Sequence, residues 1–434
     1  MMTTPTSLDP RAPSDPASAD LVLRQVTLPD GATADVLLAD GRISAIGPAG
    51  SPTPARTSVE ELDGYVLLPA FVEPHAHLDK AFTADLVANP TGSLDGAITA
   101  WLAARVAFDV DHIAARAHEA ARRYLAQGTT AIRSHVDTGE GIDLRAFVAL
   151  SGLRPALEGL VDLQIVALCS RPVTGLAGAT NRALVAEALA AGADLVGGAP
   201  AIDDDPAGAV DALAELAVTA GVGLDLHIDE TLDPEAFSLG RLLEVARAGF
   251  PSAITASHVV SLGQFDLDRQ QRVAAELAEA GVAVVTLPQT NLFLQGRGHR
   301  GPVPRGLTAV RSLLDAGVTV AAGGDNIQDP FNPMGRADPL EAASLLVVAA
   351  HLAPGEALSA VTSAARRALG LDPVAVEVGA PADLVAVRGA SASAALAAAS
   401  PERVVLAAGR VVARTKLEVS NALADRRLEG ATWS

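Results

Sequence analysis

The chain has 434 residues, 49% of them hydrophobic but only 3% aromatic, so we expect a large core built mainly from Ala, Val and Leu. A formal net charge of −19 argues against nucleic-acid polymers and anionic membranes as partners. The single cysteine, Cys169, excludes an internal disulfide and a cysteine-rich zinc site. No apolar run is long enough to span a membrane. These features predict a cytoplasmic protein acting on a small molecule, and they leave homo-oligomer formation open.

Both ends of the chain carry short strand-like patterns. Residues 1–20 are rich in Pro, Ser and Asp and lack the features of a signal peptide, so a disordered tail is expected. In "TADVLLADGRISAIGPA" the alternation around Asp40-Gly41 predicts a β-hairpin. "PADLVAV" and "RVVLAAGRVVA" look similar, with a turn at Ala408-Gly409. We predict that residues 21–64 and 373–425 build one small β-domain, a sandwich, from both chain ends.

Residues 65–372 alternate between short apolar runs and stretches of helical period. In "DRQQRVAAELAEAG", Val273 and Leu277 keep helical spacing and Gly281 stands where a helix should end. Strand–helix alternation indicates parallel strands, and eight units predict an α/β fold, a (β/α)8 barrel. An open doubly wound sheet is the alternative. The eight runs are Val66–Val72, Thr129–Val136, Leu163–Cys169, Ala193–Gly198, Val222–His227, Ala253–Val259, Val282–Leu287 and Val318–Ala322.

Histidines and one acid fall where such a barrel places its reactive groups, at the carboxyl ends of the strands. His75 and His77 follow the first predicted strand, and His227 ends the fifth. His258 ends the sixth, and Asp325 follows the eighth. In an extended segment, the two imidazoles of an HxH motif project to the same side. We therefore predict a metal site formed by His75, His77, His227 and Asp325, although His227 could be a core histidine and Asp325 a turn residue or helix cap.

The lysine content bears on the number of metals. Two-metal barrels of this kind commonly use a carboxylated lysine on a middle strand as a bridge. The chain has only Lys80 and Lys416, and neither lies on a middle strand. A single divalent metal is therefore expected, although an acidic bridge would escape this argument.

Glu230, three residues after His227, is the candidate for proton transfer. Just past the strand end it can face a metal-bound water, whose pKa the metal lowers toward about 7. His258 can hydrogen-bond the resulting hydroxide or the developing tetrahedral oxygen. The alternatives are a surface loop acid for Glu230, as expected of Asp229 and Asp233, and a backbone-bonded strand-end histidine for His258.

At these residues the chain resembles the cytosine deaminase branch of the amidohydrolase superfamily, from about residue 64 to residue 382. The resemblance implies Zn(II) or Fe(II) held by the four predicted ligands, Glu230 as proton shuttle and His258 beside the hydroxide. It also implies attack of metal-bound hydroxide on a ring carbon bearing an exocyclic nitrogen, followed by loss of ammonia or an amine. The matching segments are "LPAFVEPHAHLDKAF", "LDLHIDE", "TASHVVSL", "NLFLQGR" and "GGDNIQDPFNPMG".

Three positions depart from cytosine deaminases. Ser170 in "ALCS" stands where those enzymes carry a glutamine, and a hydroxyl cannot offer the paired donor and acceptor of an amide. Asn326 replaces an acid, and Gly324 replaces a histidine and is expected to open space. Since each unpaired buried polar group costs about 1–3 kcal/mol, cytosine should be a poor substrate.

Further side chains are candidates for substrate contacts. Lys80 resembles a lysine of N-isopropylammelide-type aminohydrolases, where it lies near the substrate; its alternative is a solvated loop lysine. Phe331 can stack on a flat ring or pack in the core, and Arg297 can touch the substrate from a loop. We expect Cys169 to be a buried, inert thiol and His135 to be structural.

The leading hypothesis is a metal-dependent aminohydrolase, a deaminase, that releases ammonia from a small nitrogen heterocycle. The second is hydrolysis of a cyclic amide or release of an alkylamine from a triazine- or pyrimidine-like ring. The third is a non-catalytic binding barrel. Zinc deaminases of the base-editing type are excluded, because their signature needs more than one cysteine.

Overall fold

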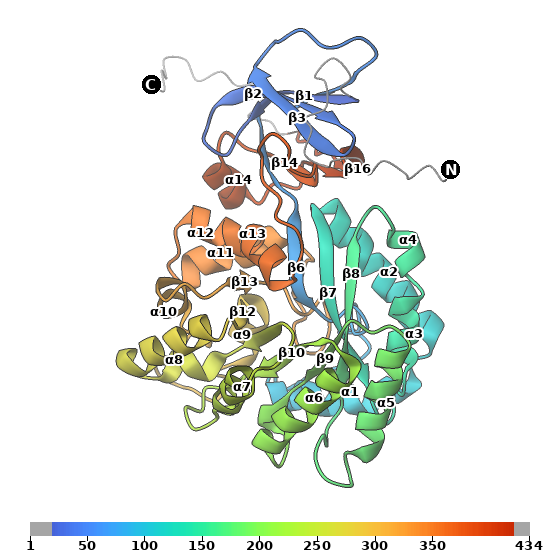
Figure 1. Ribbon diagram of the computed structural model, residues 1–434, viewed down its shortest axis with the longest axis vertical. Helices are drawn as coiled ribbons and strands as arrows, with labels where there is room; N and C mark the ends of the chain where they lie inside the picture. The colour runs from blue at the N-terminus through green and yellow to red at the C-terminus, as the bar shows by residue number, and fades with distance from the viewer. Residues whose placement is uncertain (1–19, 421–434) are drawn as a thin grey trace, which may run out of the picture.

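Two eight-stranded sheets organise residues 20–420, the part of the chain that the computed structural model describes. One sheet is a parallel barrel and the other is a mixed sheet built from both ends of the chain (Figure 1). The tail expected for residues 1–20 lies outside the described residues except for Asp20, as do residues 421–425 of the expected β-domain. None of the described helices is both long and apolar enough to cross a membrane.

The barrel strands pair in chain order, each parallel to the next, from β6 to β13. The circle is closed beyond the last strand, where the Asp325 N–H donates to His75 O (3.1 Å) and the His77 N–H donates to Asp325 O (3.2 Å). This order confirms the predicted barrel, because a doubly wound sheet would reverse its strand order. The strands are β6 (Phe71–Ala76), β7 (Thr129–Thr138), β8 (Asp162–Cys169), β9 (Leu195–Gly198), β10 (Gly223–Ile228), β11 (Ile254–His258), β12 (Ala283–Thr286) and β13 (Val320–Ala322).

Helices cover the outside of the barrel, and their ends follow from local chemistry. In α8 the Asp266 side chain accepts from Arg269 N (2.8 Å), Val273 and Leu277 are buried, and Gly281 adopts a φ of +66° just after the helix. The helices are α1 (Leu94–Ala104), α2 (Val110–Ala126), α3 (Arg145–Ser151), α4 (Arg154–Leu157), α5 (Ala179–Ala190), α6 (Pro206–Ala220), α7 (Ser238–Arg247), α8 (Leu267–Glu279), α9 (Pro288–Leu294), α10 (Val310–Asp315), α11 (Pro339–Ala349), α12 (Pro354–Ala360), α13 (Ser363–Ala368) and α14 (Ala392–Ala398), with short 3-10 helices η2 (Arg105–Ala107), η3 (Pro200–Ile202) and η4 (Val260–Gln264).

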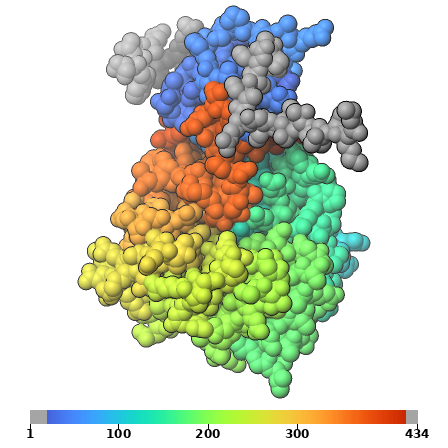
Figure 2. Space-filling model, in the orientation of Figure 1, coloured from blue at the N-terminus to red at the C-terminus, as the bar shows by residue number. Residues whose placement is uncertain are grey.

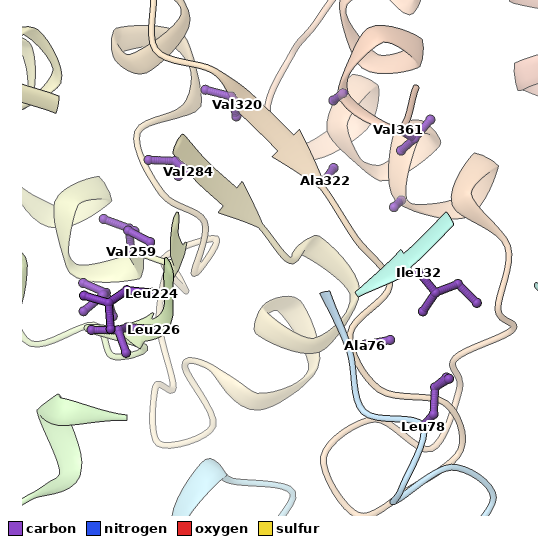
Figure 3. Close-up of a cluster of buried hydrophobic side chains, with 14 of the residues drawn as sticks. Ala76, Leu78, Ile132, Leu224, Leu226, Val259, Val284, Val320, Ala322 and Val361 are labelled. Atoms are coloured by element: carbon purple, nitrogen blue, oxygen red, sulfur yellow. The ribbon is translucent and has the colours of Figure 1, made fainter. Parts of the chain in front are cut away.

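The main core lies between the barrel strands and these helices. Figure 3 shows its aliphatic side chains on successive strands, among them Leu224 and Leu226 of β10 and Val284 of β12. Because side chains alternate along a strand, an outward Leu224 and Leu226 leave Asp225 and His227 facing the barrel interior. The same alternation that fills the core therefore delivers polar groups to the barrel axis.

The small sheet has the order β16-β15-β14-β5-β1-β2-β3, with β4 beside β1. Both predicted turns join antiparallel neighbours, and their residues have positive φ, +51° and +72° at Asp40-Gly41 and +46° and +74° at Ala408-Gly409. In Figure 2 the orange surface of the C-terminal part of the chain lies between the blue N-terminal strands of the small sheet and the green and yellow barrel. The strands are β1 (Leu21–Thr27), β2 (Thr33–Ala39), β3 (Arg42–Pro48), β4 (Ser58–Glu61), β5 (Tyr65–Pro69), β14 (Leu384–Arg388), β15 (Arg403–Ala407) and β16 (Arg410–Thr415).

One strand prediction is wrong. The apolar run Val66–Val72 is not a single barrel strand, because β5 pairs with β14 of the small sheet and only β6 enters the barrel. The change of sheet occurs at Ala70, whose N–H donates to Asp383 O while that of Phe71 donates to Gly128 O. Both strands are buried, so the apolar pattern carries no mark of the change.

Candidate active site

The predicted metal ligands converge at the carboxyl ends of the barrel strands. His227 Nε2 lies 3.2 Å from His75 Nε2 and 3.1 Å from His77 Nε2. Asp325 Oδ1 lies 3.4 Å from His77 Nε2 and 3.7 Å from His75 Nε2. Residues far apart in the sequence, on β6, on β10 and after β13, therefore place three ring nitrogens and a carboxylate around one point.

Asp325 reaches this point through an unusual backbone. Its φ is +63°, in the left-handed region that a non-glycine residue enters at a cost of order 1–3 kcal/mol. The two backbone hydrogen bonds to the HxH segment hold it there and offset that cost. Glu73 adds a second link, since its carboxylate accepts from Gly324 N (2.9 Å) and His75 N (3.2 Å).

The donor set fits a metal ion. Burial, and then the charges of neighbouring groups, lower the pKa of His75, His77 and His227 well below the usual value, so the rings are neutral and offer lone pairs. Ligand atoms of His75, His258 and Asp325 lie within 4.8 Å of one another, as do those of His75, His135 and His227. Imidazole nitrogens with one carboxylate suit a divalent transition metal.

A chain of hydrogen bonds behind His75 determines its tautomer. Ser257 Oγ donates to Asp225 Oδ1 (2.9 Å), so it must accept from His75 Nδ1 (2.9 Å). Arg133 Nη1 holds the other oxygen of Asp225 at 2.8 Å. The proton of His75 therefore lies on Nδ1, and the Nε2 lone pair faces the ligand cluster. The sequence analysis missed this chain, although polar residues inside three apolar strands were its signal.

Glu230 and His258 lie side by side at the edge of the cluster. Asn291 Nδ2 lies 3.1 Å from Glu230 Oε1 and 3.0 Å from His258 Nδ1, and the latter two atoms are 3.4 Å apart. Burial raises the pKa of Glu230 to about 8, against a smaller lowering by Asn291. Burial lowers the pKa of His258 to about 3. Sequence analysis missed Asn291, although it begins the "NLFLQGR" segment.

Asp229 is not the surface acid that was expected. It is fully buried, and its carboxylate accepts from Ser238 N (2.9 Å), Ser238 Oγ (2.6 Å) and Leu239 N (3.0 Å) at the start of α7. The side chain thus satisfies the free N–H groups of a helix end. Asp229 is buried because α7 packs over it in the folded protein. Asp233 is exposed, as expected.

The two side chains expected to be structural lie close to the site. The ring of His135 lies against that of His75 with centroids 3.9 Å apart and planes tilted by 31°, and its Nε2 lies 3.5 Å from Asp225 Oδ1. His135 therefore lies directly beside the ligand cluster, with a ligand atom within 4.8 Å of those of His75 and His227. Burial raises the pKa of Cys169 to about 12, which suits an inert thiol.

A cavity of about 560 Å³ opens over the ligand cluster. Glu230 and His258 line it together with His77, His227 and Asp325. The predicted substrate contacts line it as well, namely Lys80, Ser170, Arg297, Asn326 and Phe331. The size suits a small ring compound with substituents.

Lys80 is a buried side chain, so its interpretation as a solvated loop lysine is wrong. Only 3% of the residue is exposed, and its Nζ lies 2.7 Å from Asp137 Oδ1. The other oxygen of Asp137 accepts from Trp101 Nε1 (2.6 Å) and Arg105 Nη1 (2.9 Å). Burial favours the neutral Lys80, but Asp137 and Asp79 outweigh it and raise the lysine pKa. Sequence analysis missed Asp137, Trp101 and Arg105.

The space expected at Gly324 is filled. A Cβ atom there would lie 3.0 Å from Gln289 Oε1 and 3.3 Å from Glu73 Oε2. Asn326 is also occupied, because its Oδ1 accepts from Thr290 Oγ1 (3.3 Å) and its Nδ2 donates to Asp329 Oδ2 (2.8 Å). One amide N–H and one lone pair of Asn326 are left for a ligand.

A parallel β/α barrel with a buried His/Asp cluster and a cavity at its strand ends defines a metal-dependent hydrolase. The family model described as "Amidohydrolase family" matches residues 85–413. The chain belongs to the amidohydrolase family and is a hydrolase of carbon–nitrogen bonds.

Three proteins of known activity are similar to this chain over most of its length. The pterin deaminase of Rhizobium rhizogenes is 33% identical over 389 residues, which cover 88% of either chain. The 5-methylcytosine deaminase from Klebsiella pneumoniae, liganded with 5-fluorocytosine, is 29% identical with a TM-score of 0.82, covering 94% of this chain and 99% of its own. The N-isopropylammelide isopropylaminohydrolase from Burkholderia multivorans is 34% identical with a TM-score of 0.78, covering 91% and 98%. The resemblance to this group of amidohydrolases is therefore confirmed.

Proposed function

We propose that the chain is a metal-dependent aminohydrolase that removes an exocyclic amino group from a ring carbon of a small nitrogen heterocycle and releases ammonia. The observation that carries this proposal is Glu230, a carboxyl group with 12% of its side chain exposed that lines the cavity beside His258 and the ligand cluster. A group in this place can move a proton between a nucleophile and a leaving nitrogen. Two of the similar proteins are deaminases of ring compounds.

His75, His77, His227 and Asp325 would hold one divalent metal, Zn(II) or Fe(II). When bound, such a metal lowers the pKa of a water ligand toward about 7 and so supplies the nucleophile. The buried amine of Lys80 is engaged by Asp137, and the only other lysine is Lys416, so no lysine is free to bridge a second metal.

Glu230 and His258 divide the remaining work. The Asn291 amide N–H groups donate to Glu230 Oε1 and to His258 Nδ1, so the His258 proton lies on Nε2. That Nε2–H can donate to the oxygen that develops negative charge during attack. With a pKa of about 8, Glu230 accepts and returns a proton near neutral pH, which suits transfer from water to the departing amine.

Glu230→Gln tests this function. We expect the variant to keep its metal but to lose about 100- to 10,000-fold in kcat, because the amide cannot carry the proton. The measurement is ammonia release from pyrimidines, pterins, triazines, creatinine-like rings and hydantoins by metal-loaded protein. Glu235→Gln, an exposed acid on the same loop, is the matched control. A fully active Glu230→Gln would contradict the shuttle, and binding without turnover of any ring would favour a binding barrel.

Release of an alkylamine is the second candidate, favoured by the 34% identity to the N-isopropylammelide enzyme and by the buried Lys80 in the cavity wall. Analysis of the products distinguishes the candidates, because an alkylamine or a ring-opened acid replaces ammonia. Cytosine should be a poor substrate in either case, and its efficient turnover would contradict the interpretation of Ser170 and Asn326.

A further inference from the structure

We propose that Arg105 is a specificity-determining residue. Together with Ser170 and Lys80 it makes one wall of the cavity a donor-only site that takes an oxygen acceptor of the substrate, a ring carbonyl or a carboxylate. This inference rests on the proposed function and names the class of heterocycle that the cavity accepts.

Arg105 is held in a fixed position in the cavity wall. It belongs to η2, lines the cavity, and is only 6% exposed. Its Nη1 donates to Asp137 Oδ2 (2.9 Å) and Ser170 Oγ (3.0 Å), and its Nη2 donates to Glu140 O (2.6 Å). Three partners on different elements hold the guanidinium in one orientation, so the substrate meets a preorganised group.

The direction of the Ser170 hydroxyl proton follows from its hydrogen bond to Arg105. A guanidinium can only donate, so Ser170 Oγ accepts from Arg105 and its own proton stays free for a ligand in the cavity. The serine has little freedom to move away, because its N–H donates to Thr138 O (2.9 Å). Gly139 also packs so closely that a Cβ there would lie 2.5 Å from Ser170 Cβ.

Asp137 has little hydrogen-bonding capacity left for the substrate. One of its oxygens accepts from Lys80, and the other accepts from Trp101 and Arg105. Two buried cations therefore share this carboxylate, and both also line the cavity. Lys80 is also paired with Asp79, at 3.5 Å, so the two carboxylates balance the two cations. The N–H and O–H groups that this wall presents attract a carbonyl or carboxylate oxygen and repel an amino group.

The inference predicts a preference that can be measured by binding alone. Pterin and 2,4-diaminopteridine differ in a carbonyl or an amino group on the ring, with a ring N–H beside the carbonyl, and so do cytosine and 2,4-diaminopyrimidine. The unpaired donors that face an amino group should weaken its binding about 10- to 100-fold. Isothermal titration of metal-loaded protein, for each pair at a pH where both of its rings are neutral, gives the ratio of the two Kd values.

Variants of Arg105 and Ser170 show which side chain causes the preference for a carbonyl over an amino group. We expect Arg105→Gln, which brings in an acceptor and removes the charge, to lose most of the ratio, and Arg105→Lys to keep part of it. Ser170→Ala removes only a hydroxyl and should lower the ratio less, so it carries the test if Arg105→Gln does not fold. Arg171→Gln is the matched control, because the one side-chain hydrogen bond of this exposed cavity arginine within residues 20–420 goes to Ile202 O, at 3.4 Å.

The ratio of Kd values tests the role of Arg105, and ammonia release tests the proposed deamination. Equal Kd values within the pairs, an unchanged ratio in Arg105→Gln, or no binding of any carbonyl ring overturns the role of Arg105. Ammonia release from the same compounds is the separate measure of deamination. A preference for carbonyl rings without ammonia release would support the role of Arg105 and overturn the deaminase.

Discussion

At the scale of single residues, the metal cluster depends on side chains that do not touch the metal position. His75 can offer Nε2 only while its proton stays on Nδ1, and Ser257 accepts that proton because Asp225 takes the serine's own. All three residues are fully buried, so no water replaces a lost partner.

Ser257→Ala should therefore lower the affinity for a divalent metal about 10- to 100-fold, the usual effect of losing a partner of a metal-bound histidine. Competition with a chelator measures the affinity without any substrate. Ser261→Ala is the control, because this buried hydroxyl has no hydrogen-bond partner among residues 20–420. Equal affinity in the two variants would mean that the hydroxyl does not position His75.

Asp137 makes a pH-dependent contribution at the same scale. Burial raises its pKa, but Lys80 and Arg105 outweigh burial and lower the pKa to about 2 from the usual 3.8. A depressed carboxyl pKa stabilises the fold above the unfolded value, and this contribution is lost as the pH falls from about 4 through 2.

Asp137→Asn should thus destabilise the protein most near pH 7, where it leaves buried Arg105 without its carboxylate and Lys80 with only the more distant Asp79, at 3.5 Å. Its free energy of unfolding should approach that of the unsubstituted protein by about 2 kcal/mol as the pH falls below 4. Urea unfolding at several pH values measures the difference. A difference that is independent of pH would contradict the depressed pKa.

At the scale of elements, Arg403 connects the small sheet to two helices that cover the barrel. This fully buried side chain of β15 makes a two-pronged pair with Asp338, at 2.8 and 2.7 Å, and Asp338 caps α11. The same guanidinium donates to Gln127 O (2.6 Å) at the end of α2. The small sheet therefore contacts the helical layer of the barrel through a polar link inside an apolar interface.

Arg403→Met should lower the free energy of unfolding by about 3–5 kcal/mol, because Asp338 is left without its cation. Arg414→Met, which breaks the partly exposed pair with Glu60, should cost less than about 1 kcal/mol. Denaturant unfolding of both variants gives the comparison. Similar losses would mean that the Arg403 pair adds nothing beyond a surface contact.

At the scale of the whole molecule, the predicted ligands tie together the two strands that close the barrel. His75 and His77 lie at the end of β6, and Asp325 follows β13, while His227 comes from the opposite half of the strand order. A metal held by all four would favour the closed barrel over the unfolded chain, in which these residues are far apart.

Removal of the metal by a chelator should therefore lower the Tm, by an amount that corresponds to about 2.7 kcal/mol when free metal stands at 100 times its Kd. Adding back metal should restore the Tm with about one equivalent per chain. His227→Asn, which lacks a ligand, should show no such shift. A reproducible requirement for two equivalents would contradict the single-metal proposal.

Local patterns in the sequence were sufficient to predict the barrel, seven of its strands and the place where the candidate ligands come together. Strand alternation sends Leu224 and Leu226 outward and His227 inward whatever else the chain does, and parallel strands bring their carboxyl ends to one edge. For this reason the convergence of His75, His77, His227, His258 and Asp325 could be predicted from the sequence alone.

Tertiary structure alone decided which polar groups stand behind and beside these ligands. Ser257, Asp225 and Arg105 gain their partners from segments 30 or more residues away, and no periodicity records such pairs. The burial of Asp229 under α7 and the change of sheet at Ala70 are likewise invisible in a local pattern. The convergence of the four predicted ligands is a product of strand geometry, whereas the donor-rich wall that would choose the substrate is a product of packing between distant elements.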